Sequence, residues 1–192
     1  MLVAAPLASH FEGYRAKAYY DPAHILSVCY GETAGVDPAK VYSKDECATQ
    51  LRARMARDYA PKLIATNCLP QLNDMNRRYV FGALLDASYN AGPAAVCKSR
   101  MAASIRAGDW VAACKGFIGW YTTARDRRTG QRIQLKGLVT RRQAEAKTCA
   151  TPVAIAAAPM PPVTTTPTVR PALPAKPLSI WQRIARFFAH LF

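Results

Sequence analysis

The clearest hydrophobic pattern in the chain runs from Asn73 to Tyr89, where apolar residues recur at helical spacing. This pattern predicts a long, largely buried helix. The side chains expected to face inward are Val80, Leu84, Leu85 and Ala87. The sequence Asn-Ala-Gly-Pro at 90–93 should end the helix, because glycine and proline typically follow helix C-termini.

Shorter patterns precede this helix. A first helix is expected to end near Glu12-Gly13. The segment from Tyr19 to Tyr30 combines aromatic and β-branched residues with a turn signal at Pro22-Ala23-His24, which predicts a small β-hairpin. A loop should follow over Gly31 to Pro38.

Further helices are indicated on both sides of residue 73. Ser43-Lys44-Asp45-Glu46 has the form of a capping box and should open a helix through Leu51, Met55 and Tyr59. Later helices are expected over Val96 to Arg106, Asp109 to Phe117 and Gly137 to Ala150. The predicted fold is α+β and mainly helical, with a small sheet lobe and a cleft where the two lobes meet.

The composition changes near residue 150. Glu145 is the last of the 12 acidic residues, and positions 151–178 are rich in Pro, Thr and Ala, which predicts an extended linker. Residues 179–192 form an amphipathic pattern with basic residues on one side. The apolar side consists of Ile180, Ile184, Phe187, Phe188 and Leu191. The predicted organisation is a domain over 1–150, a linker over 151–178 and a cationic helix over 179–192.

The terminal helix suggests contact with an anionic membrane. A helix of this length reaches only about 21 Å, which is less than the roughly 30 Å of a bilayer core. It should therefore lie in the membrane interface. Docking on the domain or on a partner is the alternative. At the other end, the apolar segment Met1 to Ser9 is either the trimmed end of a signal-anchor or the beginning of the first helix.

The formal net charge of +14 favours anionic partners such as nucleic acid, an anionic membrane or an acidic cell-wall polymer. The sequence has no zinc-finger spacing and no aromatic RNA-binding motif, so a nucleic-acid partner is not expected.

The chain has six cysteines, at positions 29, 47, 68, 97, 114 and 149. They form no close pairs of the kind that bind zinc, so no metal is expected. An even number at wide spacing fits disulfides made outside the cytosol. Many connectivities are possible, and our hypothesis is sequential pairing: Cys29–Cys47, Cys68–Cys97 and Cys114–Cys149. Buried free thiols are the alternative.

Two carboxylates and a hydroxyl near the N-terminus indicate glycosidase chemistry. Glu12, Asp21 and Ser27 follow one another at intervals of nine and six residues within Phe-Glu-Gly, Tyr-Tyr-Asp-Pro and Leu-Ser-Val-Cys-Tyr-Gly-Glu-Thr. Such groups can protonate and hydrolyse a sugar–sugar bond. Together with Ser-Tyr-Asn-Ala-Gly at 88–92 and the segment 137–145, the pattern resembles phage-type lysozymes, glycoside hydrolase family 24. The resemblance covers roughly residues 8–150 and implies a lysozyme-like, two-lobed domain.

The resemblance assigns roles to these residues. Glu12 would be the general acid, and Asp21 would hold a water for attack on the far face of the sugar. Ser27 stands where the family usually has threonine; it keeps the hydroxyl that orients this water and loses the methyl that fixes the rotamer. Alternatively, Asp21 initiates a turn and Ser27 is an ordinary strand residue.

Other positions follow from the same resemblance. Arg141 and Arg142 should lie near the cleft, where one would pair with Glu12 or bind substrate and the other would be solvated. Tyr89, Asn90 and Gly92 would line the sugar groove, unless they only end a helix.

Glu32 departs from the family, which usually has histidine there. The change should alter a local ion pair, and a third carboxylate near the cleft could influence Glu12. His10, His24 and His190 offer no plausible triad with a serine or cysteine, which argues against amidase or peptidase chemistry.

The implied function is that of an endolysin that cleaves the bond between N-acetylmuramic acid and N-acetylglucosamine in peptidoglycan. It would need no cofactor, act as a monomer, stay in the host cytoplasm until release and then reach the cell wall. One alternative is a lytic transglycosylase. Another is a membrane-disrupting protein whose domain only anchors it to the wall.

Overall fold

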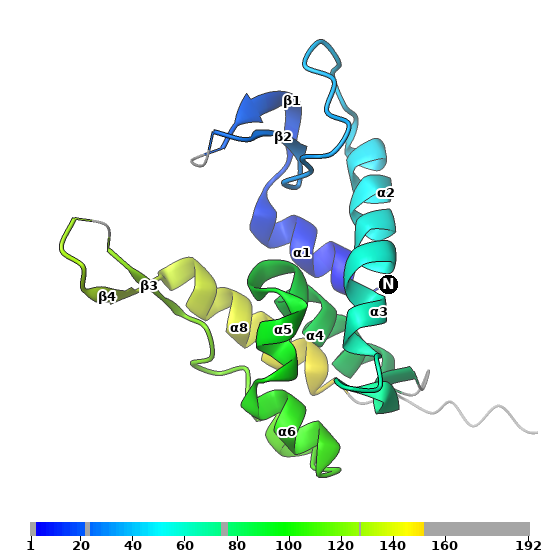
Figure 1. The fold of residues 1–192 in the computed structure, drawn as a ribbon, viewed down its shortest axis with the longest axis vertical. Helices are drawn as coiled ribbons and strands as arrows, with labels where there is room; N and C mark the ends of the chain where they lie inside the picture. The colour runs from blue at the N-terminus through cyan, green and yellow to red at the C-terminus, as the bar shows by residue number, and fades with distance from the viewer. Residues whose placement is uncertain (1–2, 22–23, 74–76, 127, 152–192) are drawn as a thin grey trace, which may run out of the picture. The chain divides into compact units, whose positions relative to one another are not determined.

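A computed structural model describes residues 3–21, 24–73, 77–126 and 128–151 (Figure 1). The predicted terminal helix over 179–192 and all but the first residue of the predicted linker lie outside these ranges. Part of the predicted hairpin turn, at 22–23, does so as well.

The N-terminal part consists of a helix followed by a hairpin. Helix α1 (Ala4–Glu12) ends at Gly13, whose φ of 74° is a conformation that glycine adopts readily. Strands β1 (Arg15–Tyr20) and β2 (Leu26–Cys29) pair antiparallel, with Tyr19 opposite Ser27. The predicted end of the first helix and the predicted hairpin are both confirmed, although the hairpin begins earlier than Tyr19.

The capping box is also confirmed. The Ser43 hydroxyl accepts a hydrogen bond from the Glu46 N–H, the Glu46 carboxylate accepts one from the Ser43 N–H, and α2 (Lys44–Arg54) begins there. A π-helical turn, η1 (Met55–Tyr59), follows, and then α3 (Ala60–Leu63). Pro61 explains this turn in part: it has no N–H to donate, and the preceding Ala60 N–H bonds the Met55 carbonyl instead.

Helix α4 (Arg78–Ala91) is the predicted buried helix, and it packs against α1, α5 and α8. Its predicted inward-facing residues, Val80, Leu84, Leu85 and Ala87, are all buried. The helix begins later than Asn73, which instead ends a 3-10 turn, η2 (Pro70–Asn73). It ends as predicted before Gly92, whose φ is 88°.

The region predicted as one helix from Val96 to Arg106 contains two, α5 (Pro93–Cys97) and α6 (Arg100–Arg106). The single-helix prediction is wrong because the Ser99 hydroxyl accepts a hydrogen bond from the Ala102 N–H and so starts a new helix. Helices α7 (Trp110–Lys115) and α8 (Lys136–Cys149) match their predictions within a few residues. A second hairpin, β3 (Thr123–Arg125) and β4 (Arg132–Gln134), was not predicted.

The mainly helical α+β prediction is confirmed. The β1–β2 hairpin and α2 lie at one end, and α4, α5, α6 and α8 form the other, with α1 between them (Figure 1). Three disulfides, Cys29–Cys47, Cys68–Cys97 and Cys114–Cys149, have the sequential pairing of our hypothesis. Within the described ranges, no helix is both long and apolar enough to cross a membrane.

Candidate active site

Glu12 and Arg141 meet at the junction between α1 and α8. Glu12 is the last residue of α1, and Arg141 lies near the start of α8. Arg141 Nη1 donates a hydrogen bond of 2.6 Å to Glu12 Oε1. The Glu12 side chain is 28% exposed, whereas that of Arg141 is only 4% exposed. A carboxyl that contacts both solvent and a buried cation is therefore present where the sequence predicted the general acid.

A second carboxylate, Asp86 on α4, holds the other edge of the same guanidinium. Arg141 Nη2 donates to Asp86 Oδ1 at 2.8 Å and Nε donates to Oδ2 at 3.0 Å. Asp86 is fully buried. Burial by itself would lower the pKa of Arg141, but the hydrogen bonds and charge of Asp86, aided by Glu12, raise this pKa above its ordinary value. Arg141 is therefore a permanently charged link between the two carboxylates.

Arg142 points into the protein. It was expected to be solvated, and this expectation is wrong, because the residue is fully buried. Its Nη2 donates to Glu145 Oε1 at 2.6 Å and to Asn90 Oδ1 at 3.1 Å, and its guanidinium lies 5.1 Å from the centre of the Trp120 ring. A buried guanidinium needs such partners to offset its lost hydration.

The partner of Arg142, Glu145, is also fully buried. Burial, and secondarily the neighbouring Asp86, raises the pKa of the Glu145 carboxyl. Asn90, predicted to line a sugar groove, is thus also a structural partner of this buried pair.

The other two predicted catalytic residues lie on the first hairpin. Asp21 directly follows β1, and its Oδ1 accepts a hydrogen bond of 2.9 Å from the Ile25 N–H. Ser27 lies on β2, is 2% exposed, and donates its hydroxyl to the Ile25 carbonyl at 3.1 Å. Both side chains therefore bond the same residue of the hairpin. The hydrogen bond from the Ile25 N–H to Asp21 is that of a turn, as in the alternative interpretation of Asp21. A residue in such a turn can also have a catalytic role.

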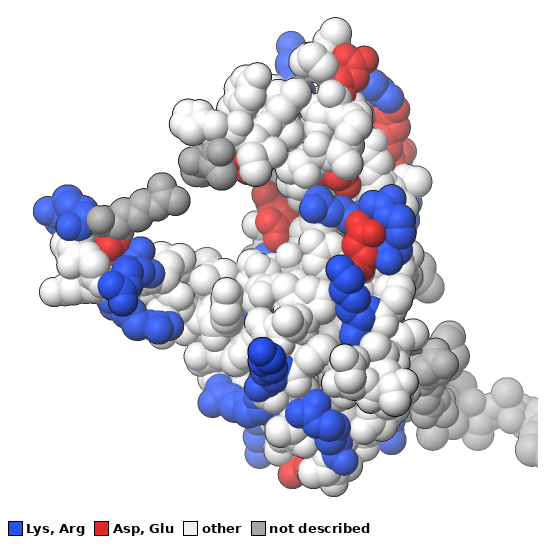
Figure 2. All heavy atoms as spheres, viewed as in Figure 1, with Lys and Arg blue, Asp and Glu red and all other residues white. Residues whose placement is uncertain are grey.

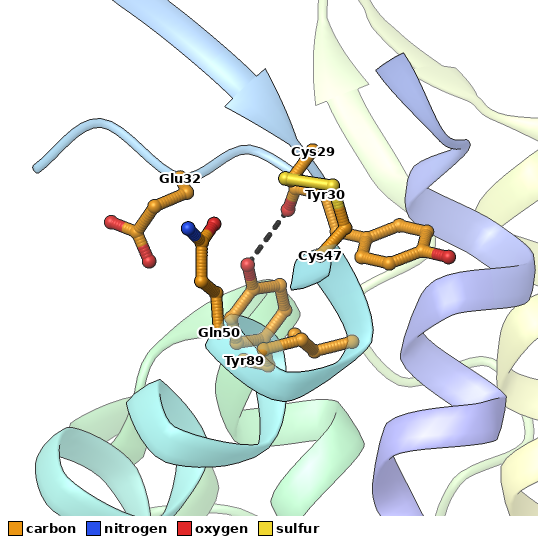
Figure 3. A pocket seen from close by; sticks show the side chains of 7 residues that line it. Cys29, Tyr30, Glu32, Cys47, Gln50 and Tyr89 are labelled. Atoms are coloured by element: carbon orange, nitrogen blue, oxygen red, sulfur yellow. Dashed lines mark hydrogen bonds between the residues drawn. A yellow bond between two sulfur atoms is a disulfide. The ribbon is translucent and has the colours of Figure 1, made fainter. Parts of the chain in front are cut away.

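Tyr89 and Glu32 lie around a small pocket beside the Cys29–Cys47 disulfide (Figure 3). The Tyr89 hydroxyl, directed from α4, donates to the Tyr30 carbonyl at 2.8 Å, and burial raises the pKa of this phenol. The pocket is too narrow for a sugar ring, since it has no space for even a water molecule. Tyr89 therefore joins α4 to the hairpin lobe.

Glu32 forms an ion pair in this chain. Glu32 Oε1 lies 3.7 Å from Arg54 Nη1, and Arg54 Nη1 also donates to the Gly31 carbonyl at 2.8 Å. The same carboxylate oxygen accepts the Thr33 and Ala34 N–H groups. Glu32 is thus held by the loop after β2 and by α2.

The surface is hollowed between the part over β1–β2 and the part over β3–β4, with acidic side chains at its inner end (Figure 2). Lysine and arginine gather on the β3–β4 side, where Arg125, Arg128 and Arg132 are found (Figure 2). This hollow corresponds to the predicted cleft. No group of three or more His, Cys, Asp and Glu side chains able to hold a metal occurs among the described residues.

Sequence reasoning missed Asp86. The sequence does indicate that Asp86 is unusual, because it interrupts an apolar run on the predicted buried helix. A charged residue in such a place requires a partner. The identity of that partner could not be read from the helix itself. Arg141 lies 55 positions further along the chain.

Comparisons with known proteins identify the family and the fold of this chain. The phage lysozyme family model matches residues 9–145. The SAR-endolysin of bacteriophage PS119 is 32% identical over 139 residues, which cover 72% of this chain and 75% of that protein. An endolysin from Escherichia coli O157:H7 phage FAHEc1 has a similar fold, with a TM-score of 0.64 at 21% identity, over 79% of this chain and 92% of that one. The muramidase domain of SpmX from Asticaccaulis excentricus gives a TM-score of 0.65 at 22% identity, over 78% and 95% of the two chains.

Proposed function

Because the chain belongs to the phage lysozyme family, we propose that it is an endolysin that hydrolyses the β-1,4 bond between N-acetylmuramic acid and N-acetylglucosamine in peptidoglycan. The observation that carries this proposal is the pairing of Glu12 with Arg141. A partly exposed carboxyl at the end of α1 is fixed by a guanidinium that is itself almost fully buried. Fixed orientation of an acid relative to its substrate is what proton transfer requires.

The proposed reaction is a single displacement by water. Glu12 gives its proton to the glycosidic oxygen as the bond to the sugar carbon breaks. A water molecule attacks the same carbon from the opposite face, and Asp21 takes up the proton that this water releases. The products are two glycan ends with inverted configuration at the new reducing end. Glu12 and Asp21 lie on α1 and on the following hairpin, so two separate elements supply the two carboxylates.

Ser27 is proposed to support the water that Asp21 holds. Its hydroxyl donates to the Ile25 carbonyl, and the Ile25 N–H donates to Asp21. A hydroxyl at position 27 can therefore affect the water directly or through the position of Asp21.

Substrate binding is proposed to involve both lobes. Arg141 would contact the sugar next to Glu12, and Arg142 with Asn90 would shape the groove from beneath. Tyr89 would also shape the groove. Its hydroxyl donates to the Tyr30 carbonyl and so connects α4 to the hairpin lobe. The partners are the glycan strands of the cell wall, and the protein would act on them as a monomer.

The tail is proposed to bring the enzyme to an anionic membrane. The support is the sequence of residues 179–192, with its apolar and basic sides, and the Pro-rich segment before it. In this proposal the protein stays in the host cytoplasm until release and then acts in the periplasm. Deleting residues 151–192 should reduce lysis of intact Gram-negative cells while activity on purified peptidoglycan is kept. Unchanged lysis of cells would refute the role of the tail.

The reaction is tested by mass spectrometry of the fragments released from purified peptidoglycan, with Glu12→Gln as the control. Glutamine keeps the shape of the side chain but has no acidic proton. Fragments that end in reducing muramic acid, and that are lost in the variant, are the expected result. Anhydro-muramic ends would instead indicate a lytic transglycosylase. An absence of glycan fragments would indicate that the domain acts only as a wall anchor.

A further inference from the structure

The guanidinium of Arg141 is held on two edges by groups from two different helices. Its Nε and Nη2 atoms form a fork on both oxygens of Asp86, at 3.0 and 2.8 Å, while Nη1 reaches Glu12 at 2.6 Å. A guanidinium is planar, so fixing one edge fixes the direction in which the remaining nitrogen points. The orientation of Nη1 toward Glu12 is therefore set by a carboxylate that does not itself reach the surface.

We propose that Asp86 is a positioning residue for the general acid: it holds Arg141 against Glu12. This inference rests on the proposed role of Glu12. Asp86 is fully buried and would not touch the glycan, so it acts only through Arg141. A helix–helix contact alone would not require a charged residue, because α4 already buries a row of apolar side chains against its neighbours.

The charge balance is a second reason for a carboxylate at position 86. Arg141 is almost fully buried, and the hydrogen bonds and charge of Asp86 offset the lost hydration of its guanidinium. Glu145 Oε1 lies 3.7 Å from Arg141 Nε but only 2.6 Å from Arg142 Nη2, so it mainly pairs with Arg142. Removing the charge of Asp86 should therefore leave Arg141 less firmly held beside Glu12.

The test compares Asp86→Asn with the wild type in kcat and KM on soluble peptidoglycan strands. Asparagine has the same size, but one acceptor oxygen becomes an amide that cannot accept a hydrogen bond from Arg141. We expect kcat to fall about 10- to 100-fold with little change in KM. An unchanged kcat would overturn the proposal.

Ser88→Ala is the matched control. Ser88 lies on the same helix, is also fully buried, and its hydroxyl has no hydrogen-bond partner among the described residues. Its substitution perturbs α4 without touching Arg141, so kcat and KM should stay as in the wild type. A fall in kcat of the same size in both variants would show that Asp86→Asn acts only by loosening α4, which would overturn the proposal.

A double variant tests whether Asp86 acts through Arg141. In an Arg141→Met background the link is already broken, so adding Asp86→Asn should cause no further loss of kcat. If the two losses multiply instead, Asp86 acts independently and the proposal is wrong.

Two further results need their own interpretation: a variant that does not fold, and a wild type that shows no hydrolysis. If Asp86→Asn does not fold, Arg141→Lys keeps the charge but loses the fork, and wild-type kcat in that variant would overturn the proposal. If the wild type itself releases no hydrolytic fragments, the proposed function fails. If the wild type releases hydrolytic fragments and Asp86→Asn has the same kcat as the wild type, only the positioning role is refuted.

Discussion

Arg141 Nη1 lies 2.6 Å from Glu12 Oε1, although the two residues are 129 positions apart in the chain. Glu12 ends the first helix of the domain and Arg141 lies near the beginning of its last one. Their contact joins the part of the chain that carries the predicted acid to the helices at the other end of the domain. The stability of the domain and the geometry of the site therefore depend on the same side chain.

Arg141→Ala should destabilise the protein strongly. The change leaves the fully buried Asp86 without its two hydrogen bonds, and removing one partner of a buried ion pair typically costs about 3–5 kcal/mol. The free energy of unfolding in urea measures the effect. The comparison is Arg57→Ala, which breaks an exposed pair with Asp58 and should leave the unfolding midpoint nearly unchanged. Equal effects of the two substitutions would contradict a buried ion pair at Arg141.

Ser27→Ala should reduce glycan hydrolysis, whereas Ser27→Thr should retain it. Alanine removes the hydroxyl that bonds the Ile25 carbonyl, while threonine keeps a hydroxyl and restricts its rotamer. Initial rates of peptidoglycan hydrolysis, compared at equal folded fraction, distinguish the two. Equal activity of both variants would exclude a role for the hydroxyl. Because Ser27 is buried, the added methyl must be checked by the thermal midpoint of the Thr variant.

Gly82→Ala should destabilise the contact between α1 and α4. A Cβ atom at position 82 would lie 2.6 Å from both Cβ and Cγ1 of Val3, so the chain before α1 would have to move. Overpacking of this kind typically costs about 1–3 kcal/mol, which exceeds the gain of up to about 1 kcal/mol from the helix propensity of alanine.

Gly137→Ala is the matched control for Gly82. Gly137 also lies in a helix, α8, but an added Cβ there meets no atom within 4 Å. Chemical denaturation of both variants should show a loss for position 82 and no loss for position 137. Similar stabilities would mean that α1 and α4 do not approach closely at Gly82.

Glu46 should make stability depend on pH in the acidic range. A hydrogen bond from Lys40, followed by those of the Ser43 cap, lowers the pKa of the Glu46 carboxyl from 4.5 to about 2. A carboxyl with a lowered pKa in the folded state stabilises the protein above its unfolded pKa, and this contribution disappears as the pH falls through the folded value. Stability from Glu46 should therefore be complete above about pH 4.5 and be lost toward about pH 2.

Glu46→Gln isolates this contribution. Glutamine keeps an oxygen that can accept the Ser43 N–H but carries no charge for Lys40. Thermal midpoints of the two proteins should differ at neutral pH and converge as the pH approaches 2. A difference that stays constant over this range would show that the ionised carboxylate contributes nothing to the cap.

The sequence by itself determined the features whose causes are local. Gly13 ends α1, the Ser43–Glu46 box opens α2, and the Asn-Ala-Gly-Pro segment ends α4. Each depends on backbone conformation or on hydrogen bonds between residues close in the chain. The break between α5 and α6 could also have been predicted from the sequence, because Ser99 is a serine that caps the N-terminus of α6. The β3–β4 hairpin was not predicted, because its short polar strands carry little hydrophobic alternation.

Only the tertiary structure decided which distant groups meet. The sequence placed Glu12 at a helix end but could not select Arg141 over Arg142 as its partner, and Arg142 proved to be buried against Glu145. It allowed many disulfide connectivities, and the fold selected one of them. Asp86 was visible as a charge on an apolar helix, but its partner was not. The physical reason is that hydrogen-bonding and ionic partners are chosen by the packing of α1, α4 and α8, and packing depends on contacts that no local pattern encodes.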